Sequence, residues 1–155
     1  MAPFRSYVTL LQKYLRKIRP NRILEWGPGG STALMIQECP HAEIVSYEHD
    51  SEWFKVAVNK FSRDNVFIRH AVEQDYYAPK ACGKFGVIFV DGRWRNECLV
   101  TSLSLLREGG VVILHDSERD QYRKAWKPIY SILEADDDKG TIVLVPKIGS
   151  QTYEE

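Results

Sequence analysis

The sequence predicts an α/β protein with a single doubly wound, mostly parallel sheet that is covered by helices on both faces. The chain has 155 residues, which is enough for one domain and one core. Hydrophobic residues make up 44% and charged residues 27%, an ordinary globular mixture that argues against a disordered, collagen-like or coiled-coil chain. Short apolar strand patterns alternate with helical patterns, and this alternation implies crossover connections between parallel strands.

In the first half of the chain, an initial helix is followed by three strands. The initial helix places apolar residues on one face, with Ser6 as a plausible N-cap and Pro20 beyond its end. The helix after the first strand ends at Cys39, because a residue that precedes proline disfavours helical geometry. The expected elements are a helix over 6–18, a strand over 22–26, a helix over 31–39, a strand over 43–48, a helix over 50–61 and a strand over 65–70.

The second half continues the alternation with one irregular segment. Residues 73–84 contain Pro79 and Gly83 and show no period, so we expect a loop or a broken helix. The expected elements are then a strand over 85–91, a helix over 96–109 that stops at Gly109, a strand over 111–116, a helix over 119–135 and a strand over 140–147. The domain reading is one unit over 1–155, with an N-terminal helix in 1–20, a core over 21–147 and a polar tail over 148–155.

The charge balance limits the classes of binding partner that we expect, and the cysteine content indicates the redox state of the compartment. The 21 basic residues balance the 21 acidic ones, so no global field favours nucleic acid or an anionic membrane. The basic residues of the first helix are best explained as its solvated face. No apolar run approaches the length of a membrane span, and we expect no membrane association. Three cysteines without metal-site spacing, Cys39, Cys82 and Cys98, favour a reduced, cytoplasmic setting.

The stretch "ILEWGPGGSTALMI" joins the first strand to the second helix through a glycine turn. Gly27 and Gly29 allow the backbone to turn sharply and to approach a ligand, and Ser31 or Thr32 can cap the helix. The dinucleotide fingerprint requires glycine where this chain has Thr32, so the turn fits a diphosphate poorly.

Two carboxylates change the ligand that this turn predicts. Glu25 stands two residues before Gly27, where it repels phosphate but attracts a cationic amino group. Glu48 ends the second strand, 21 residues beyond Gly27, where a carboxylate accepts hydrogen bonds from both hydroxyls of a ribose. Adenosine combined with an amino-acid cation describes S-adenosylmethionine, which is therefore the expected cofactor.

Four motifs in order, "LEWGPGGST", "VSYEHD", "FGVIFVDGRWR" and "LREGGVVILHD", resemble the class I S-adenosylmethionine-dependent methyltransferases over roughly residues 20–120. The resemblance implies a Rossmann-like fold and methyl transfer. It also implies that the family's final hairpin is either trimmed here or includes a strand hidden in residues 126–135. The residues that it assigns to the cofactor are Glu25, Gly27, Gly29 and Ser31 at the methionine end, Glu48 at the ribose, His49, Ala71 and Val72 near adenine, and Asp91 beside the methyl group.

Asp91 and Asp116 close neighbouring strands and are the expected catalytic bases. For each of them alone, helix capping is an equally good interpretation. The catechol O-methyltransferase branch implies a divalent metal between such acids, but Ser117 replaces a better ligand, so a metal is possible and not favoured. His115 is interpreted as a structural histidine that points away from the acids, into the sheet face.

Arg93, Trp94 and Arg95 follow the fourth strand, and substrate contact and a capping or surface role are equally open for them. The acceptor is expected to be a small molecule of unknown identity. The site could also be completed by a second copy of the chain, so a homo-oligomer is possible. Two alternatives to an active methyltransferase remain, namely a methyltransferase-like domain that binds cofactor or partner without turnover, and a nucleotide- or NAD-binding oxidoreductase that Glu25 and Thr32 disfavour.

Overall fold

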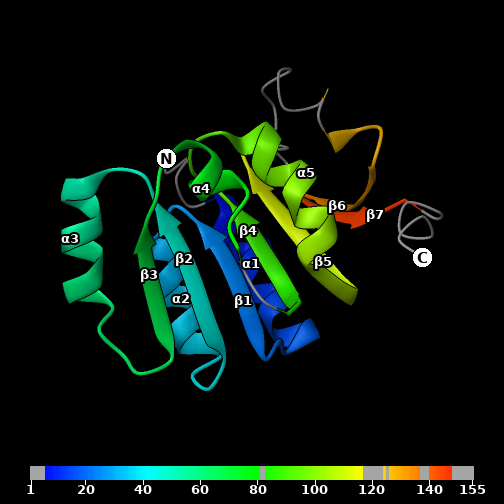
Figure 1. Cartoon of the computed structure of the whole chain (residues 1–155). Helices are drawn as coiled ribbons and strands as arrows, with labels where there is room; N and C mark the ends of the chain where they lie inside the picture. Colours follow the sequence, from blue (N-terminus) through cyan, green and yellow to red (C-terminus); the bar gives the residue numbers. More distant parts are fainter. Residues whose placement is uncertain (1–5, 81–82, 117–123, 125, 137–139, 148–155) are drawn as a thin grey trace.

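The computed structural model describes residues 6–80, 83–116, 124, 126–136 and 140–147. These residues form one seven-stranded sheet in the order β3-β2-β1-β4-β5-β7-β6, with helices on both faces (Figure 1). The predicted doubly wound α/β class is confirmed. The strands are β1 (Arg22–Trp26), β2 (Glu43–Glu48), β3 (Val66–His70), β4 (Phe85–Val90), β5 (Leu106–His115), β6 (Tyr130–Ala135) and β7 (Thr141–Pro146). The helices are α1 (Ser6–Ile18), α2 (Gly30–Glu38), α3 (Ser51–Lys60), α4 (Glu73–Tyr77) and α5 (Arg95–Leu105).

The first five strands in sheet order, β3 to β5, run parallel, so their carboxyl ends meet at one edge. The register aligns Trp26 of β1 with Tyr47 of β2 and with Val90 of β4. The strand order reverses between β1 and β4, because β2 and β3 extend to one side of β1 and β4 and β5 to the other. In open parallel sheets this switch point is where ligands bind.

Alternate strand residues divide the core into two clusters, one on each face of the sheet. One face packs against α1, α2 and α3 through Leu11, Met35 and Ala57, all of which are fully buried. The other packs against α4 and α5 through Tyr76 and Leu99. In Figure 1, α4 and α5 lie in front of the sheet, whereas α1 and α2 lie behind it. The helical period that predicted α1 is confirmed by its buried residues Leu10, Leu11, Tyr14 and Leu15.

The C-terminal part differs from the helix predicted over 119–135. Residues 117–123 and 125 lie outside the described part of the chain, but residues from Tyr130 onward form β6, an edge strand that pairs antiparallel with β7. The hidden-strand alternative was therefore right, and the hairpin is complete. The Tyr130 side chain is buried and its hydroxyl donates to the Leu99 carbonyl of α5 at 2.8 Å, whereas Ile132 and Leu133 are about half exposed. A strand with one buried anchor and several exposed apolar residues does not show a clean two-residue period.

The boundary between α5 and β5 was also predicted wrongly. The helix ends at Leu105 instead of Gly109, and β5 begins at Leu106. Gly109 has φ +81° inside this strand, and the pairing with β4 shifts between Phe85 and Val87. A Cβ on Gly110 would lie 2.7 Å from the Gly86 carbonyl oxygen, so the glycines allow a bulge and a close backbone approach. None of the helices in the described ranges is long and apolar enough to span a bilayer.

Candidate functional site

The glycine turn after β1 lies at the switch point and contacts the end of β4. Gly27 has φ +94°, and a Cβ there would lie 2.7 Å from the Asp91 carbonyl oxygen. Glycine is therefore required at this position by both conformation and space. A Cβ on Gly29, in contrast, would meet no atom within 4 Å. The Gly29 amide donates to the Thr32 hydroxyl at 3.0 Å, which fixes the start of α2. The turn is packed on the Gly27 side and open on the Gly29 side.

Glu25 lies beneath this turn and is fully buried. Its carboxylate accepts hydrogen bonds from the hydroxyls of Ser31, Thr32 at 2.6 Å and Ser46 at 3.0 Å. Burial raises the pKa of Glu25 to about 7, although the three hydroxyl donors oppose this shift. Through these buried hydrogen bonds, Glu25 of β1 holds α2 and β2 against the first strand. The interaction with a ligand ammonium that the sequence predicts for Glu25, and the cofactor contact predicted for Ser31, stay predictions.

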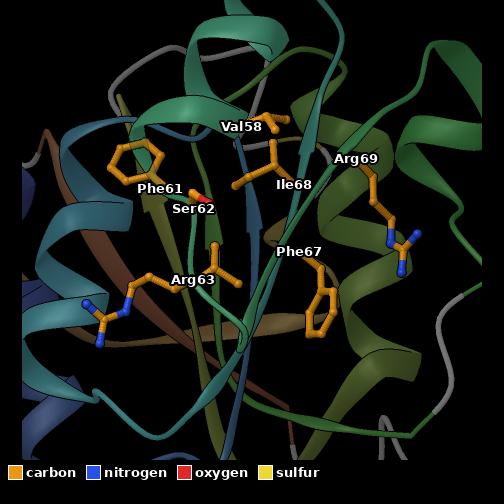
Figure 2. A pocket seen from close by; sticks show the side chains of 8 residues that line it. Val58, Phe61, Ser62, Arg63, Phe67, Ile68 and Arg69 are labelled. Carbon is orange, nitrogen blue, oxygen red and sulfur yellow. The ribbon is translucent and has the colours of Figure 1, made fainter.

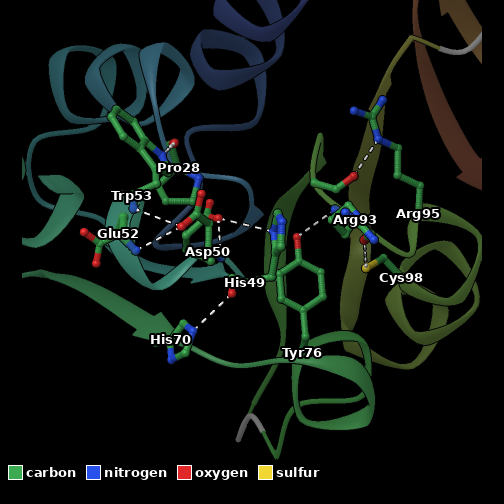
Figure 3. Close-up of polar contacts among 12 residues, drawn as sticks. Pro28, His49, Asp50, Glu52, Trp53, His70, Tyr76, Arg93, Arg95 and Cys98 are labelled. Carbon is green, nitrogen blue, oxygen red and sulfur yellow. Dashed lines mark hydrogen bonds and ion pairs between the residues drawn. The ribbon is translucent and has the colours of Figure 1, made fainter. Parts of the chain in front are cut away.

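Glu48 ends β2 beside the turn and is almost fully buried. Its Oε2 atom accepts from the Asp50 amide at 2.8 Å and lies 3.2 Å from Nδ1 of His49. No described residue donates a hydrogen bond to the other oxygen, Oε1. The Trp53 indole of α3 donates to the Pro28 carbonyl at 2.7 Å, which ties this region to the glycine turn (Figure 3). A carboxylate held by its neighbours with one uncommitted oxygen is suited to accept ligand hydroxyls.

An aromatic cluster extends from Glu48 along the strand ends. His49 meets Tyr76 and Trp94 edge to face, with ring centroids 6.1 Å apart in both pairs. The Tyr76 hydroxyl accepts from the Arg93 amide at 3.1 Å, and a Cβ on Gly92 would collide with this hydroxyl (Figure 3). The three rings therefore contact one another beside the loop that follows β4.

Ala71 and Val72, predicted near adenine, follow β3 directly. The Ala71 amide donates to the Glu48 carbonyl at 3.0 Å, which holds the two strand ends together. Ala71 packs against the core cluster on this face, whereas Val72 is 49% exposed. Both residues therefore lie within the same edge as Glu48, and their contact with adenine stays a prediction.

Asp91, His115 and Asp116 form a compact cluster at the ends of β4 and β5. One ligand atom from each of them lies within 4.8 Å of those of the others. His115 is buried and its Nδ1 lies 3.1 Å from the Thr141 hydroxyl, as expected for a structural histidine. It does not, however, point away from the acids, because its Nε2 lies 3.8 Å from Asp116. Asp116 has φ +59°, so the chain turns sharply there and the alternation of a strand no longer separates the two side chains.

Arg95 joins these strand ends through its guanidinium group. Its Nε donates to the Gly92 carbonyl at 2.8 Å and its Nη1 to the His115 carbonyl at 2.6 Å. Its Nη2 donates to Asp91 at 3.2 Å. Burial raises the pKa of Asp91, while His115 and Arg95 oppose that shift. Arg95 is thus engaged inside the protein, whereas the Arg93 guanidinium lies over the Trp94 ring at 5.5 Å. The substrate contacts predicted for all three residues stay predictions.

Tyr7 is a site residue that the sequence did not single out. Its ring packs edge to face on His115 at 5.3 Å and tilted on Phe89 at 5.5 Å. A Cβ on Gly30 would lie 2.5 Å from its hydroxyl. Burial and the charges of Asp91 and Glu25 raise the pKa of Tyr7. Tyr7 lies in the first turn of α1, and only this position could have indicated that its hydroxyl reaches the strand ends.

Comparison with known proteins gives a consistent result at the level of structure. No protein-family model matches the chain, and no curated protein matches it in sequence. A Podospora anserina methyltransferase bound to S-adenosylhomocysteine superposes with a TM-score of 0.71 at 20% identity, over 90% of this chain and 77% of that one. A candidate caffeoyl-CoA O-methyltransferase from Staphylococcus aureus gives 0.72 at 15% identity, over 90% and 82%. A methyltransferase-like protein from Silicibacter pomeroyi gives 0.70 at 18% identity, over 90% and 84%.

The chain has the class I methyltransferase fold. In this fold, the described residues with ligand-binding chemistry gather at the carboxyl ends of β1, β2, β4 and β5. A separate pocket of about 260 Å³ lies along β3 and the end of α3, lined by Phe61, Arg63 and Phe67 among others (Figure 2). It includes none of the predicted site residues. Open parallel sheets bind their ligands at the switch point, so the candidate site is the edge where these strands end and not this pocket.

Proposed function

We propose that this protein is an S-adenosylmethionine-dependent methyltransferase with a small-molecule acceptor. The observation that carries the proposal is the arrangement of Glu48 and the glycine turn. Oxygen Oε1 of Glu48 has no donor among the described residues, and the open side of the turn at Gly29 lies at the same edge of the sheet. A carboxylate for ribose hydroxyls next to exposed backbone is what an adenosine ligand with an amino-acid tail requires.

The donor set at this edge fits the proposed cofactor and disfavours a diphosphate. Glu25, Glu48 and Asp91 place three carboxyl groups around the turn, where they repel phosphate and favour a ligand that carries an ammonium and a sulfonium. Nδ1 of His49 lies 3.2 Å from Oε2 of Glu48, so His49 helps to hold that oxygen rather than Oε1. Glu48 would hold the ribose, His49 and Val72 would flank the adenine, and the turn would contact the methionine tail.

When bound, the cofactor supplies an activated methyl group, so the protein needs only to align an acceptor and accept its proton. Asp116 is the more exposed of the two candidate bases, with 37% of its side chain accessible. Asp91 is held by Arg95 and would orient the acceptor at the end of β4. Tyr7 and Trp94 would border the acceptor from α1 and from the loop after β4. This arrangement suits an acceptor with a hydroxyl or amino group.

Calorimetric titration with S-adenosylhomocysteine tests the proposal, because this product needs no acceptor and cannot react. We expect micromolar binding by the wild type and at least a tenfold loss in Glu48→Ala. Glu52→Ala is a matched control, since Glu52 is an exposed carboxylate in the first turn of α3 that pairs only with Lys55 among the described residues. Absence of binding by the folded wild type, or binding of a nicotinamide dinucleotide in its place, would overturn the proposal. Formation of S-adenosylhomocysteine from S-adenosylmethionine with an acceptor panel then tests turnover.

A further inference from the structure

The acids at the ends of β4 and β5 resemble a site for a divalent cation. Asp91, His115 and Asp116 offer two carboxylates and an imidazole with ligand atoms within 4.8 Å of one another. Carboxylate oxygens are preferred by Mg²⁺ and Ca²⁺, and imidazole by several transition metals. The sequence resemblance to the catechol O-methyltransferase branch points in the same direction. The question is therefore whether the residues around these acids leave room for an ion.

The Arg95 guanidinium already lies between the two carboxylates. Its Nη2 lies 3.2 Å from Oδ1 of Asp91, and its Nη1 lies 3.7 Å from Oδ2 of Asp116. Only 12% of the Arg95 side chain is exposed. Its Nε and Nη1 are also bonded to the carbonyls of Gly92 and His115. An ion that used these acids would have to displace a guanidinium with three anchored nitrogens, or share the space with its positive charge.

The place of Arg95 on α5 supports the same conclusion. Arg95 is the first residue of this helix, and a cation there opposes the helix dipole. The preceding residue, Trp94, has φ +49° and gives no side-chain cap. Local helix energetics therefore do not explain an arginine at this position. The two carboxylates and the two strand-end carbonyls do, because together they require a cation.

We propose that Arg95 is a positioning residue that takes the place of a divalent cation at the ends of β4 and β5, so that the site works without a metal. Its guanidinium holds Asp91 and Asp116 in a fixed relation and joins the Gly92 turn to the end of β5. The divalent ion suggested by the sequence resemblance does not fit these residues. This inference deepens the proposed function, because the same acids are the proposed acceptor-binding groups, but its test needs neither cofactor nor acceptor.

The test is Mn²⁺ binding, measured from the loss of the free-ion signal in electron paramagnetic resonance spectra. We expect no binding by the wild type at 1:1 stoichiometry, about tenfold or stronger gain in affinity in Arg95→Ala, and loss of that gain in Arg95→Ala combined with Asp91→Asn. Arg95→Lys keeps the charge and is expected to bind no Mn²⁺. Arg93→Ala removes the same charge two residues away without freeing either carboxylate, so it is the matched control and is also expected to bind none.

Two results would overturn the inference. One is Mn²⁺ binding by the wild type that Asp91→Asn abolishes. The other is a folded Arg95→Ala protein, verified by circular dichroism, that gains no Mn²⁺ binding. If Arg95→Ala does not fold, the wild type still decides, because Mn²⁺ binding by the wild type that Asp91→Asn abolishes would contradict a resident guanidinium. Failure of the methyltransferase proposal would appear separately, as absent S-adenosylhomocysteine binding in the wild type.

Discussion

Glu25 shows at the residue scale how one buried side chain can determine local structure. The sequence indicated a carboxylate next to the glycine turn, and the structure places it beneath the turn with three hydroxyl donors. These donors come from α2 and β2, so Glu25 fixes the start of α2, and with it the glycine turn, relative to the sheet. Because water is excluded, its proton affinity is high and its charge state depends on what lies nearby.

Glu25 should make stability depend on pH in the weakly acidic range. Its folded-state pKa of about 7 lies above the ordinary value of 4.5, so the folded protein holds a proton that the unfolded chain releases. Stability therefore falls as pH rises through this window, and the loss is complete above the folded-state pKa. Glu25→Gln has no proton to lose at this position. We therefore expect the unfolding free energy of the wild type to fall by about 2 kcal/mol relative to that of Glu25→Gln when the pH is raised from 5 to 8. Urea unfolding of both proteins at the two pH values measures this shift, and parallel pH profiles would contradict it.

Gly27 and Gly29 provide a matched pair of substitutions in the same turn. Gly27→Ala places a Cβ at positive φ, 2.7 Å from a backbone oxygen, so we expect a loss of about 2 kcal/mol or more. Gly29→Ala meets no neighbour within 4 Å and has φ 170°, so stability should change by less than about 1 kcal/mol. Under the proposed function, Gly29→Ala should nevertheless weaken S-adenosylhomocysteine binding at least tenfold. Thermal unfolding combined with calorimetry separates these effects, and unchanged binding in Gly29→Ala would place the ligand elsewhere.

At the scale of elements, the sequence predicted six of the seven strands and missed β6, one of the two edge strands. β4 is a continuous apolar run, and β1 and β2 are buried over all but their first residue, because helices cover both faces of these strands. β6 is covered on one side only and pairs with a single neighbour, so Tyr130 is buried while Ile132 and Leu133 are exposed. The spacing of Tyr130, Ile132 and Leu133 is compatible with a helix as well as with a strand. Only the pairing of this segment with β7 determines that it forms a strand.

The same reasoning explains what the sequence could and could not predict about the site. Gly27 and Glu48 follow buried strands directly, so local pattern was enough to place them at the switch point. Tyr7 and Arg95 reach the site from the first turns of α1 and α5, and His115 faces the acids because Asp116 adopts positive φ. Packing between distant segments and a single unusual backbone angle leave no periodic signal in a sequence. The position of Gly27 and Glu48 at the switch point was therefore predictable, whereas the contacts that Tyr7, Arg95 and His115 make with the acids were not.

The single anchor of β6 gives a prediction about the edge of the sheet. Tyr130→Phe removes the hydrogen bond to the Leu99 carbonyl and should reduce the unfolding free energy by about 1 kcal/mol. Tyr130→Ala also leaves a cavity against α5 and should cost about 3–5 kcal/mol. Ile132→Ala, on the exposed face of the same strand, is the control and should change stability by less than about 0.5 kcal/mol. Urea unfolding measures all three; equal effects at 130 and 132 would mean that β6 is not anchored through Tyr130.

At the scale of the whole molecule, a formal charge of zero hides an uneven distribution. Glu25, Glu48, Asp91 and Asp116 gather at the carboxyl ends of the strands, and Arg95 is the basic residue that lies between the last two. Such a concentration of acids favours a cationic ligand at one edge without making the protein acidic overall. Ligand selectivity should therefore follow the charge of this edge and not the net charge of the protein.

This selectivity can be measured as a shift in thermal stability. A ligand that binds only the folded state at 100 times its dissociation constant adds about 2.7 kcal/mol. For a domain of this size that corresponds to a rise in Tm of roughly 5–10 °C. We expect S-adenosylhomocysteine to raise the Tm of the wild type by this amount and that of Glu48→Ala by much less. A nicotinamide dinucleotide at the same concentration should give no shift, because its diphosphate would face the carboxylates around the glycine turn. A larger shift with the dinucleotide than with S-adenosylhomocysteine would mean that the acids at the switch point do not select the ligand, and the proposed cofactor would then be wrong.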